Sequence, residues 1–302
     1  CSDKSSDTSG LISLAQDKLA EIEAEPALPA IIQSYDITEK SYGLGHDIEF
    51  AITFNKVVAV ASGAPKLVLD IGGVSRDAVL VSGSGTNQFI FSYTTQAGDT
   101  DSDGIQLVVD LDSSIVLDED LVAPDFTLPT LDLTNVLVDT TAPSISVLKP
   151  PVDGVYAQGD KVSFSIQLDE AVVVSGAPQI PIIINAVSMN AIYVSGNLSD
   201  TLTFEYEIRA NEVDTDGIDY TDLDINTGSI QDDSGNDAVT TLTASNLANV
   251  KIDAVAPSAD SIIINSGESY VTDHNLTLNL TATDASEVYI TENADCSTGG
   301  TW

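Results

Sequence analysis

The sequence predicts an all-β protein of tandem Greek-key β-sandwiches, preceded by a short N-terminal tether and helix. Three observations support this prediction: one pattern recurs at a constant spacing, apolar and polar residues alternate, and Gly/Ser clusters separate the alternating stretches. A constant spacing indicates a tandem array. Period-two alternation indicates strands with one buried face. Several short strands in each repeat are typical of a sandwich with Greek-key connections.

The repeat defines the domain organisation. Ser62-Gly63-Ala64-Pro65 returns as Ser175-Gly176-Ala177-Pro178, so residue 62 corresponds to residue 175, 113 positions later. The closing motif Val138–Pro143 returns as Ile252–Pro257, 114 positions later. We therefore expect a tether at 1–29, sandwich domains at 30–143 and 144–257, and an incomplete third domain at 258–302.

The N-terminal segment changes character twice. Residues 1–10 are small and polar, as in a flexible tether. Helical spacing follows, and Pro26 limits the helix; the apolar positions with this spacing are Ile12, Ala15, Leu19 and Ile22. An isolated helix of this length is weak in water, so a frayed segment is the alternative.

Alternating stretches begin after about Ile31 and mark the strands. The longest run is in the first repeat, and it has a counterpart in the second and a shorter one after Pro257. The alternating apolar residues are Ile48, Phe50, Ile52 and Phe54; Val162, Phe164, Ile166 and Leu168; and Leu276, Leu278 and Leu280. We expect each set to face a core.

The charge balance excludes some functions. The chain has 47 acidic and 10 basic residues and a formal net charge of −37. Nucleic-acid binding requires Lys and Arg to neutralise phosphates, and adhesion to an anionic membrane by charge requires the same residues. Two explanations remain for the acidic residues: solubility, including solubility in a salty medium, or calcium binding.

Catalytic and zinc signatures are absent from the sequence. The two cysteines, Cys1 and Cys296, do not imply a disulfide framework, and with two histidines they are too few for a typical zinc site. His46 and His274 lie in turn-like sequences without the motif of a catalytic base. No stretch has the ~20 apolar residues of a spanning helix. The sequence therefore predicts a protein that is not an enzyme.

The acidic loops are the predicted calcium ligands. Asp99, Asp101 and Asp103 alternate before Gly104, and an EF-hand is rejected because the flanks are strand-like. Sandwich topology predicts that each loop lies beside the following linker and faces the next domain. We expect two junction sites: one from Asp99, Asp101, Asp103, Asp139 and Asp169 or Glu170, and one from Glu212, Asp214, Asp216, Asp253 and Asp284 or Glu287. The alternative is a solvated acidic turn.

The order of motifs resembles a known family. Tyr156, Gly159-Asp160 and Phe164 precede Ser175–Pro178, and an acidic Asp-Gly-Ile loop and Asp-x-x-Ala-Pro follow. This order is similar to the bacterial Ig-like repeats of surface adhesins and exported lipoproteins, and covers roughly 31–257. The third unit resembles a different bacterial Ig-like subtype. The resemblance implies attachment or spacing without catalysis, often with calcium at domain junctions.

The N-terminal Cys1, followed by a polar tether, resembles a mature bacterial lipoprotein. This resemblance implies an acylated Cys1, a membrane contact through its lipid, and a place on the bacterial cell surface, in the outer membrane. We expect a lipoprotein stalk or adhesin with an unknown surface protein or glycan as ligand. The alternative is an accessory or glycan-binding region of a larger exported enzyme.

Overall fold

The computed structural model describes residues 13, 27–110, 114–128, 131–267, 277–285, 287, 288 and 290. Cys1, Cys296 and His274 lie outside this part of the chain, as does the predicted tether and helix region at 1–29 except for Ser13 and residues 27–29. Every named element is a β-strand except the single 3-10 turn η1 (Asn265–Gly267), so the all-β prediction is confirmed. Within the described ranges, no helix is long and apolar enough to cross a membrane.

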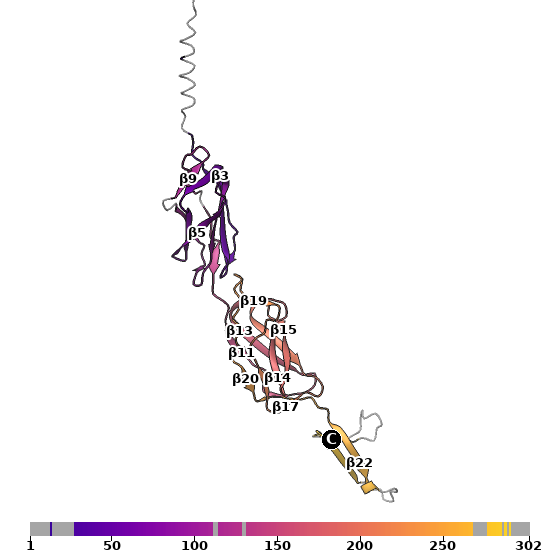
Figure 1. Ribbon diagram of the computed structural model, residues 1–302. Helices are drawn as coiled ribbons and strands as arrows, with labels where there is room; N and C mark the ends of the chain where they lie inside the picture. The colour runs from indigo at the N-terminus through magenta and orange to yellow at the C-terminus, as the bar shows by residue number, and fades with distance from the viewer. Residues whose placement is uncertain are drawn as a thin grey trace, which may run out of the picture. The chain divides into compact units, whose positions relative to one another are not determined.

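The chain divides into two compact units: unit 1 is Cys1–Thr141 with Ser234–Asn236, and unit 2 is Ala142–Asp233 with Asp237–Trp302. Each unit contains its own sandwich of curled sheets (Figure 1). The strands of unit 1 are β1 (Ile32–Asp36), β2 (Ser41–Tyr42), β3 (Asp47–Ser62), β4 (Lys66–Ile71), β5 (Val74–Ser82), β6 (Thr86–Thr94), β7 (Thr100–Asp101), β8 (Gln106–Asp110), β9 (Ile115–Asp118) and β10 (Leu137–Asp139).

The large sheet of unit 1 has the strand order β1-β3-β6-β5-β4-β8, and β9 pairs with the second half of β3. A smaller sheet has the order β2-β10-β7, in which β2 and β10 are parallel. The register of β3 shifts between Thr53 and Val58, where its pairing with β6 is interrupted. This irregularity lets one long strand contribute to two parts of the curled sheet.

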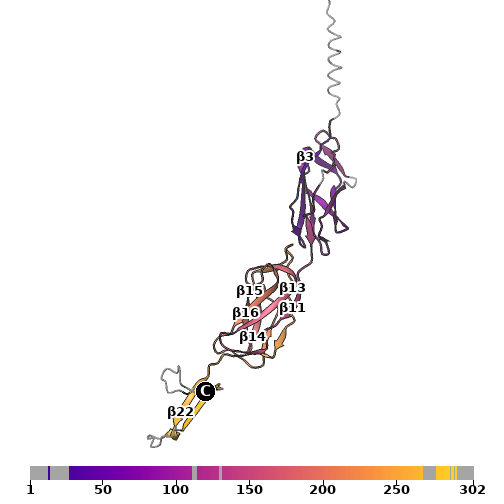
Figure 2. The ribbon, with the colours of Figure 1, turned by 180° about the vertical axis from the view of Figure 1, so that it is seen from behind.

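Unit 2 repeats this arrangement. Its strands are β11 (Ile145–Lys149), β12 (Gly154–Tyr156), β13 (Lys161–Ser175), β14 (Gln179–Ile184), β15 (Val187–Ser195), β16 (Ser199–Glu207), β17 (Val213–Asp214), β18 (Ile218–Tyr220), β19 (Ser229–Gln231), β20 (Ser245–Leu247) and β21 (Val250–Asp253). The sheets have the orders β11-β13-β16-β15-β14-β18-β20, with β19 on β13, and β12-β21-β17. Figure 2 shows β13, β15 and β16 from behind. One strand, β20, has no paired counterpart in unit 1 among the described residues.

The alternating stretches bury the predicted residues. In β3, Ile48 and Phe54 have no exposed surface, and in β13 the same is true of Val162 and Phe164. Each strand turns its intervening residues outward. Each unit has a separate hydrophobic core built on these strands. Period-two patterning therefore determines the burial of both long strands.

The third alternating stretch forms a hairpin instead of a closed sandwich. Strands β22 (Ser258–Ile264) and β23 (Leu278–Thr283) pair antiparallel as a separate two-stranded sheet. Every residue of both strands is exposed. The strand prediction for Leu278 and Leu280 is confirmed, but the buried face expected for them is not formed here. Leu276 lies outside the described residues.

Candidate functional site

In unit 1, Asp101 ties the acidic loop to the β4–β5 turn. It is only 6% exposed. Its Oδ2 accepts a hydrogen bond from the Gly72 N–H at 2.8 Å, and its Oδ1 accepts from the N–H groups of Asp103 at 3.2 Å and Gly104 at 2.8 Å. Gly72 has φ +56°, a conformation that glycine adopts without penalty. The carboxylate therefore fastens two loops that lie 29 residues apart in the chain.

Asp214 makes the same connection in unit 2. It is 4% exposed, and its oxygens accept hydrogen bonds from the N–H groups of Asn185 and Gly217, both at 2.8 Å. Asn185 has φ +46°, so the turn conformation is preserved although the residue differs. The third acidic residue of each loop, Asp103 or Asp216, is exposed. The alternating acids thus divide into a buried structural carboxylate and an exposed one.

Asp99 of unit 1 is a buried partner of a tyrosine and an arginine. Its Oδ2 accepts from the Tyr93 hydroxyl and from the Gln96 N–H, and its Oδ1 accepts from Arg76 Nε at 2.8 Å. Arg76 Nη2 also lies 2.7 Å from Asp99 Oδ1. Burial alone would raise the pKa of Asp99, but the hydrogen bonds from Tyr93, Gln96 and Arg76 outweigh it and hold the pKa below its usual value.

In unit 2 the corresponding carboxylate belongs to Glu212. Its Oε1 accepts from the Tyr206 hydroxyl and its Oε2 from the Arg209 N–H at 2.8 Å. The counterpart of Arg76 is Met189, so the guanidinium of unit 1 has no equivalent at that position. A tyrosine–carboxylate hydrogen bond is therefore the part of this arrangement that both units share.

These two tyrosines predict a stability change at alkaline pH. Burial, with the hydrogen bond to the carboxylate, raises the pKa of Tyr93 and of Tyr206 from 10.0 to about 12. The folded state therefore retains the phenolic proton that the unfolded state loses. This stabilisation is fully present below pH 10 and is lost as the pH rises to about 12.

We expect urea midpoints to fall between about pH 10 and 12 in the wild-type chain. Tyr93→Phe should flatten this dependence in unit 1, and Tyr206→Phe should flatten it in unit 2. Native-state hydrogen exchange reports the two units separately. If the urea midpoints of both variants fell with pH as steeply as those of the wild-type chain, Tyr93 and Tyr206 would not be the source of the alkaline stability loss.

The linker acids lie next to the acidic loops within their units, as the predicted topology requires. Asp139 of β10 is opposite Thr100 of β7, and Asp253 of β21 is opposite Val213 of β17. Asp139 Oδ1 accepts from the Thr141 N–H at 2.9 Å, which is a local turn. The convergence of either set with Asp169, Glu170, Asp284 or Glu287 stays a prediction; Asp284 and Glu287 are exposed.

Asp169 has a structural partner inside unit 2. The Ser144 N–H and hydroxyl donate to its two oxygens at 2.8 and 2.6 Å, and these bonds lower its pKa. Its counterpart in unit 1, Asn55, accepts from the Ile31 N–H through Oδ1 at 2.8 Å. Both side chains therefore hold the entry of the first strand of their unit, Asn55 through its amide oxygen and Asp169 through its carboxylate.

The neighbouring position differs more in charge. In unit 1, Lys56 Nζ lies 3.8 Å from Asp118 Oδ2 and 2.6 Å from Asp120 Oδ2. In unit 2 the counterpart of Lys56 is Glu170 and that of Asp118 is Asp232, which is 4% exposed. Oxygens of Glu170 and Asp232 lie within 4.8 Å of each other. A cation–carboxylate pair of unit 1 is thus a carboxylate–carboxylate pair in unit 2.

Asp118 and Asp232 were not predicted from the sequence. Asp118 accepts N–H bonds from Ala30, Asp120 and Val122, and the first of these residues is 88 positions away. The 114-residue offset between Asp118 and Asp232 was the signal available in the sequence. The sequence offset does not show which side chain lies beside each aspartate. The structure identifies these side chains as Lys56 for Asp118 and Glu170 for Asp232.

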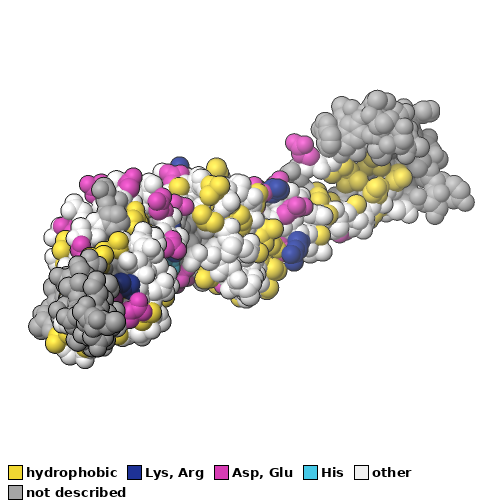
Figure 3. Space-filling view, turned by 90° about the horizontal axis from the view of Figure 1, so that it is seen from above, with side chains coloured by type: hydrophobic (Ala, Val, Ile, Leu, Met, Phe, Trp, Pro, Cys, Tyr) yellow, Lys and Arg dark blue, Asp and Glu magenta, His cyan; other side chains and the backbone are white. Residues whose placement is uncertain are grey.

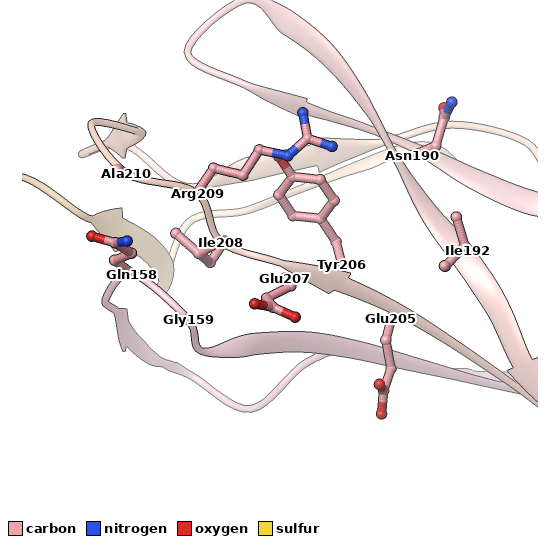
Figure 4. A pocket seen from close by; sticks show the side chains of 10 residues that line it. All are labelled: Gln158, Gly159, Asn190, Ile192, Glu205, Tyr206, Glu207, Ile208, Arg209 and Ala210. Atoms are coloured by element: carbon pink, nitrogen blue, oxygen red, sulfur yellow. The ribbon is translucent and has the colours of Figure 1, made fainter.

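A groove of about 530 Å³ in unit 2 is lined by residues of β15 and β16 and of the segment after β16 (Figure 4). Asn190 and Ile192 of β15, Tyr206 of β16 and Arg209 are among its lining residues. The guanidinium lies over the Tyr206 ring, 5.6 Å from its centroid. Tyr206 is buried, so the groove does not offer an open aromatic face on which a sugar ring could stack.

Comparisons with known proteins identify no family for this chain. No family model and no curated protein matches this chain. A DUF4785 family protein from Legionella pneumophila is 12% identical, with a TM-score of 0.22, over 70% of this chain and 55% of that chain. Domains 4–9 of the surface-layer protein SbsC are 12% identical, with a TM-score of 0.21, over 78% of this chain and 33% of that chain.

A pullulanase from Anoxybacillus, solved with maltotriose, is 11% identical, with a TM-score of 0.19, over 67% of this chain and 24% of that chain. The chain thus spans about half the length, or less, of these three structures. At such TM-scores the likenesses carry no functional argument. The fold itself defines an all-β, sandwich-type protein with two units of similar topology, each of which contains one acidic loop.

Proposed function

We propose that this chain is a non-catalytic stalk or adhesin of the bacterial Ig-like class, held at the cell surface by a lipid on Cys1. The main supporting observation is that the same sandwich occurs twice along the chain. In each copy a buried aspartate, Asp101 or Asp214, hydrogen-bonds the acidic loop to a neighbouring turn. A repeated unit of this kind suits extension and spacing. An unidentified surface protein or glycan is the proposed ligand of the full protein.

The use of the buried polar groups supports a structural role over a catalytic one. Asp99, Asp101, Asp118 and Asp214 are buried, and each accepts hydrogen bonds from two or more donors of the fold. An acid–base catalyst needs a titrating group positioned toward a substrate. These carboxylates instead hold loops and strand entries in place.

We also propose that calcium stabilises the regions next to the linkers. The supporting observation is the charge difference between Lys56 and Glu170, which face Asp118 and Asp232 respectively. Unit 1 supplies an ammonium group beside its buried aspartate, whereas unit 2 places a second carboxylate there. A divalent cation would reduce the repulsion between these carboxylates, and calcium prefers carboxylate oxygens. Acidic side chains also far outnumber basic ones on the surface (Figure 3).

Calorimetry with and without calcium tests this proposal. We expect calcium to raise the melting temperature of unit 2. When the calcium concentration is 100 times the dissociation constant, the free energy of unfolding should increase by about 2.7 kcal/mol. Glu170→Lys should stabilise unit 2 in chelator and remove its response to calcium, because the lysine reproduces the pair of unit 1. Glu207→Lys is the matched control, since Glu207 is an exposed acid of the same unit that belongs to neither predicted calcium site.

A calcium response that persists in Glu170→Lys would refute the role of the Glu170–Asp232 pair. No calcium-dependent heat or melting shift in the wild-type chain would refute calcium binding altogether. The surface assignment depends on a different measurement, mass spectrometry of the native N-terminus, where an unmodified Cys1 would contradict the lipid anchor. More repeats beyond residue 302 would favour a stalk over the accessory region of an exported enzyme.

A further inference from the structure

Unit 1 has an open sheet edge at β8. On one side β8 pairs with β4 along its whole length, from Gln106 opposite Asp70 to Asp110 opposite Lys66. In the described part of the chain, no strand pairs with its other side. Alternate residues of such an edge direct their N–H and C=O groups away from the sheet. The edge carries no Lys or Pro, the residues that commonly block pairing, and Val108 is 63% exposed.

In unit 2 the corresponding sheet edge, at β18, is paired with a further strand. There β20 pairs antiparallel with β18, the counterpart of the start of β8, with Ile218 opposite Leu247 and Tyr220 opposite Ser245. The repeat offset places residues 131–133 at the position of β20. These residues form no strand in unit 1. One strand of the sandwich is therefore missing at this edge.

Residues 131–133 make local contacts and do not pair with β8. Leu133 is buried in the core, and its carbonyl accepts from the Val136 N–H at 2.9 Å. Asp132 Oδ1 accepts from the hydroxyl and N–H of Thr134, at 2.7 and 3.2 Å. A groove of about 420 Å³ is lined by this segment and by Gln106 and Leu107. The edge and the groove are thus adjacent, and none of the residues that the structure describes forms a strand against this side of β8.

The charges around the edge restrict the occupant. Asp132 lines the groove, and Asp103 lines both the groove and a neighbouring hollow of about 250 Å³ that also contains Asp70. Asp103 and Asp132 are exposed. A second copy of this chain would bring another net charge of −37 to the same place, so electrostatic repulsion opposes self-pairing.

We propose that the β8 edge of unit 1 binds an extended basic peptide segment, which adds a strand antiparallel to β8. Backbone hydrogen bonds to β8 would supply affinity, and lysine or arginine side chains near Asp103 and Asp132 would supply selectivity. A β-branched residue of the peptide would pack beside Val108, which lies next to Val68 on the outer face of the sheet. This inference does not depend on calcium binding.

The probe is an acetylated and amidated six-residue peptide of alternating lysine and valine, added to the full 302-residue chain. We expect slower hydrogen exchange at Gln106–Val109 and no change at β18, whose edge is paired with β20. The same peptide with alternate backbone nitrogens methylated should not slow the exchange, because it cannot complete the ladder. These peptide controls require no variant of the protein.

Charge variants test the selectivity. Asp103→Asn and Asp132→Asn should each increase the dissociation constant of the peptide by about twofold to fivefold, as expected for the loss of an exposed ion pair. Fluorescence anisotropy measures this constant. Asp216→Asn, at the Asp103 position of unit 2, is the matched control and should bind unchanged. Equal binding of a glutamate–valine peptide, no protection at Gln106–Val109, or protection there from concentration-dependent dimers of the free chain would each overturn the proposal.

Discussion

Asp101→Ala is expected to destabilise unit 1 by about 2–4 kcal/mol, because three part-buried hydrogen bonds lose their shared acceptor. Their N–H donors belong to Gly72, Asp103 and Gly104. The β4–β5 turn and the acidic loop would separate, since the carboxylate is their shared hydrogen-bond acceptor. Native-state hydrogen exchange of the full chain measures the loss in unit 1 while unit 2 serves as an internal reference.

Asp103→Ala is the matched control, because Asp103 lies two residues away and is exposed. We expect a change within about 0.5 kcal/mol. The second unit offers a replicate: Asp214→Ala should be costly and Asp216→Ala should not. Equal effects of the buried and exposed acids in either unit would show that the alternating acids act only as a solvated turn.

Gly83→Ala is expected to destabilise unit 1 by about 3–5 kcal/mol, because a side chain there is both strained and obstructed. Gly83 has φ +104°, and a Cβ atom would lie 1.9 Å from the Gln88 carbonyl oxygen. Gly196, its counterpart in unit 2, has φ +119° and a Cβ position 2.1 Å from the Thr201 carbonyl oxygen. Urea denaturation of Gly83→Ala and Gly196→Ala measures both losses.

Gly85→Ala separates strain from obstruction. Gly85 has φ +84°, but a Cβ atom there would meet nothing within 4 Å. The equivalent residue of unit 2 is Leu198, at φ +61°, so this position tolerates a side chain. We expect a cost of about 1 kcal/mol from the left-handed conformation alone. If Gly83→Ala cost no more than Gly85→Ala, the close approach to the Gln88 carbonyl would not matter.

Much of the fold was predictable because the relevant information is local. Alternation places Phe50 and Phe164 on buried faces whatever the strand pairs with, and both are buried. His46 was expected in a turn at the position of Asp160. Its Nδ1 accepts from the Gly43 N–H, as Asp160 Oδ2 accepts from the Ala157 N–H. The alternation at Leu278 and Leu280 was also predicted and lies in β23, but the pairing of β23 with β22 was not predicted, and every residue of both strands is exposed.

The candidate sites were less predictable because a carboxylate has no fixed role. Asp99 and Asp103 look alike in the sequence, yet one is buried against Tyr93 and Arg76 and the other is exposed. Asp169 was predicted as a junction ligand, and this stays a prediction; its contact with Ser144 inside unit 2 was not predicted. In each case the deciding partner is distant in the chain, so residue type and spacing could not identify it.

The amino-acid sequence by itself determined the tandem repeat, the faces of the long strands and the glycines of the tight turns, since these follow from periodicity and backbone sterics. Only the tertiary structure decided which acids hold loops and which remain exposed. It also decided that Lys56 faces Asp118, whereas Glu170 faces Asp232. The physical reason is that the free energy of a carboxylate depends on burial and on donors brought from distant strands.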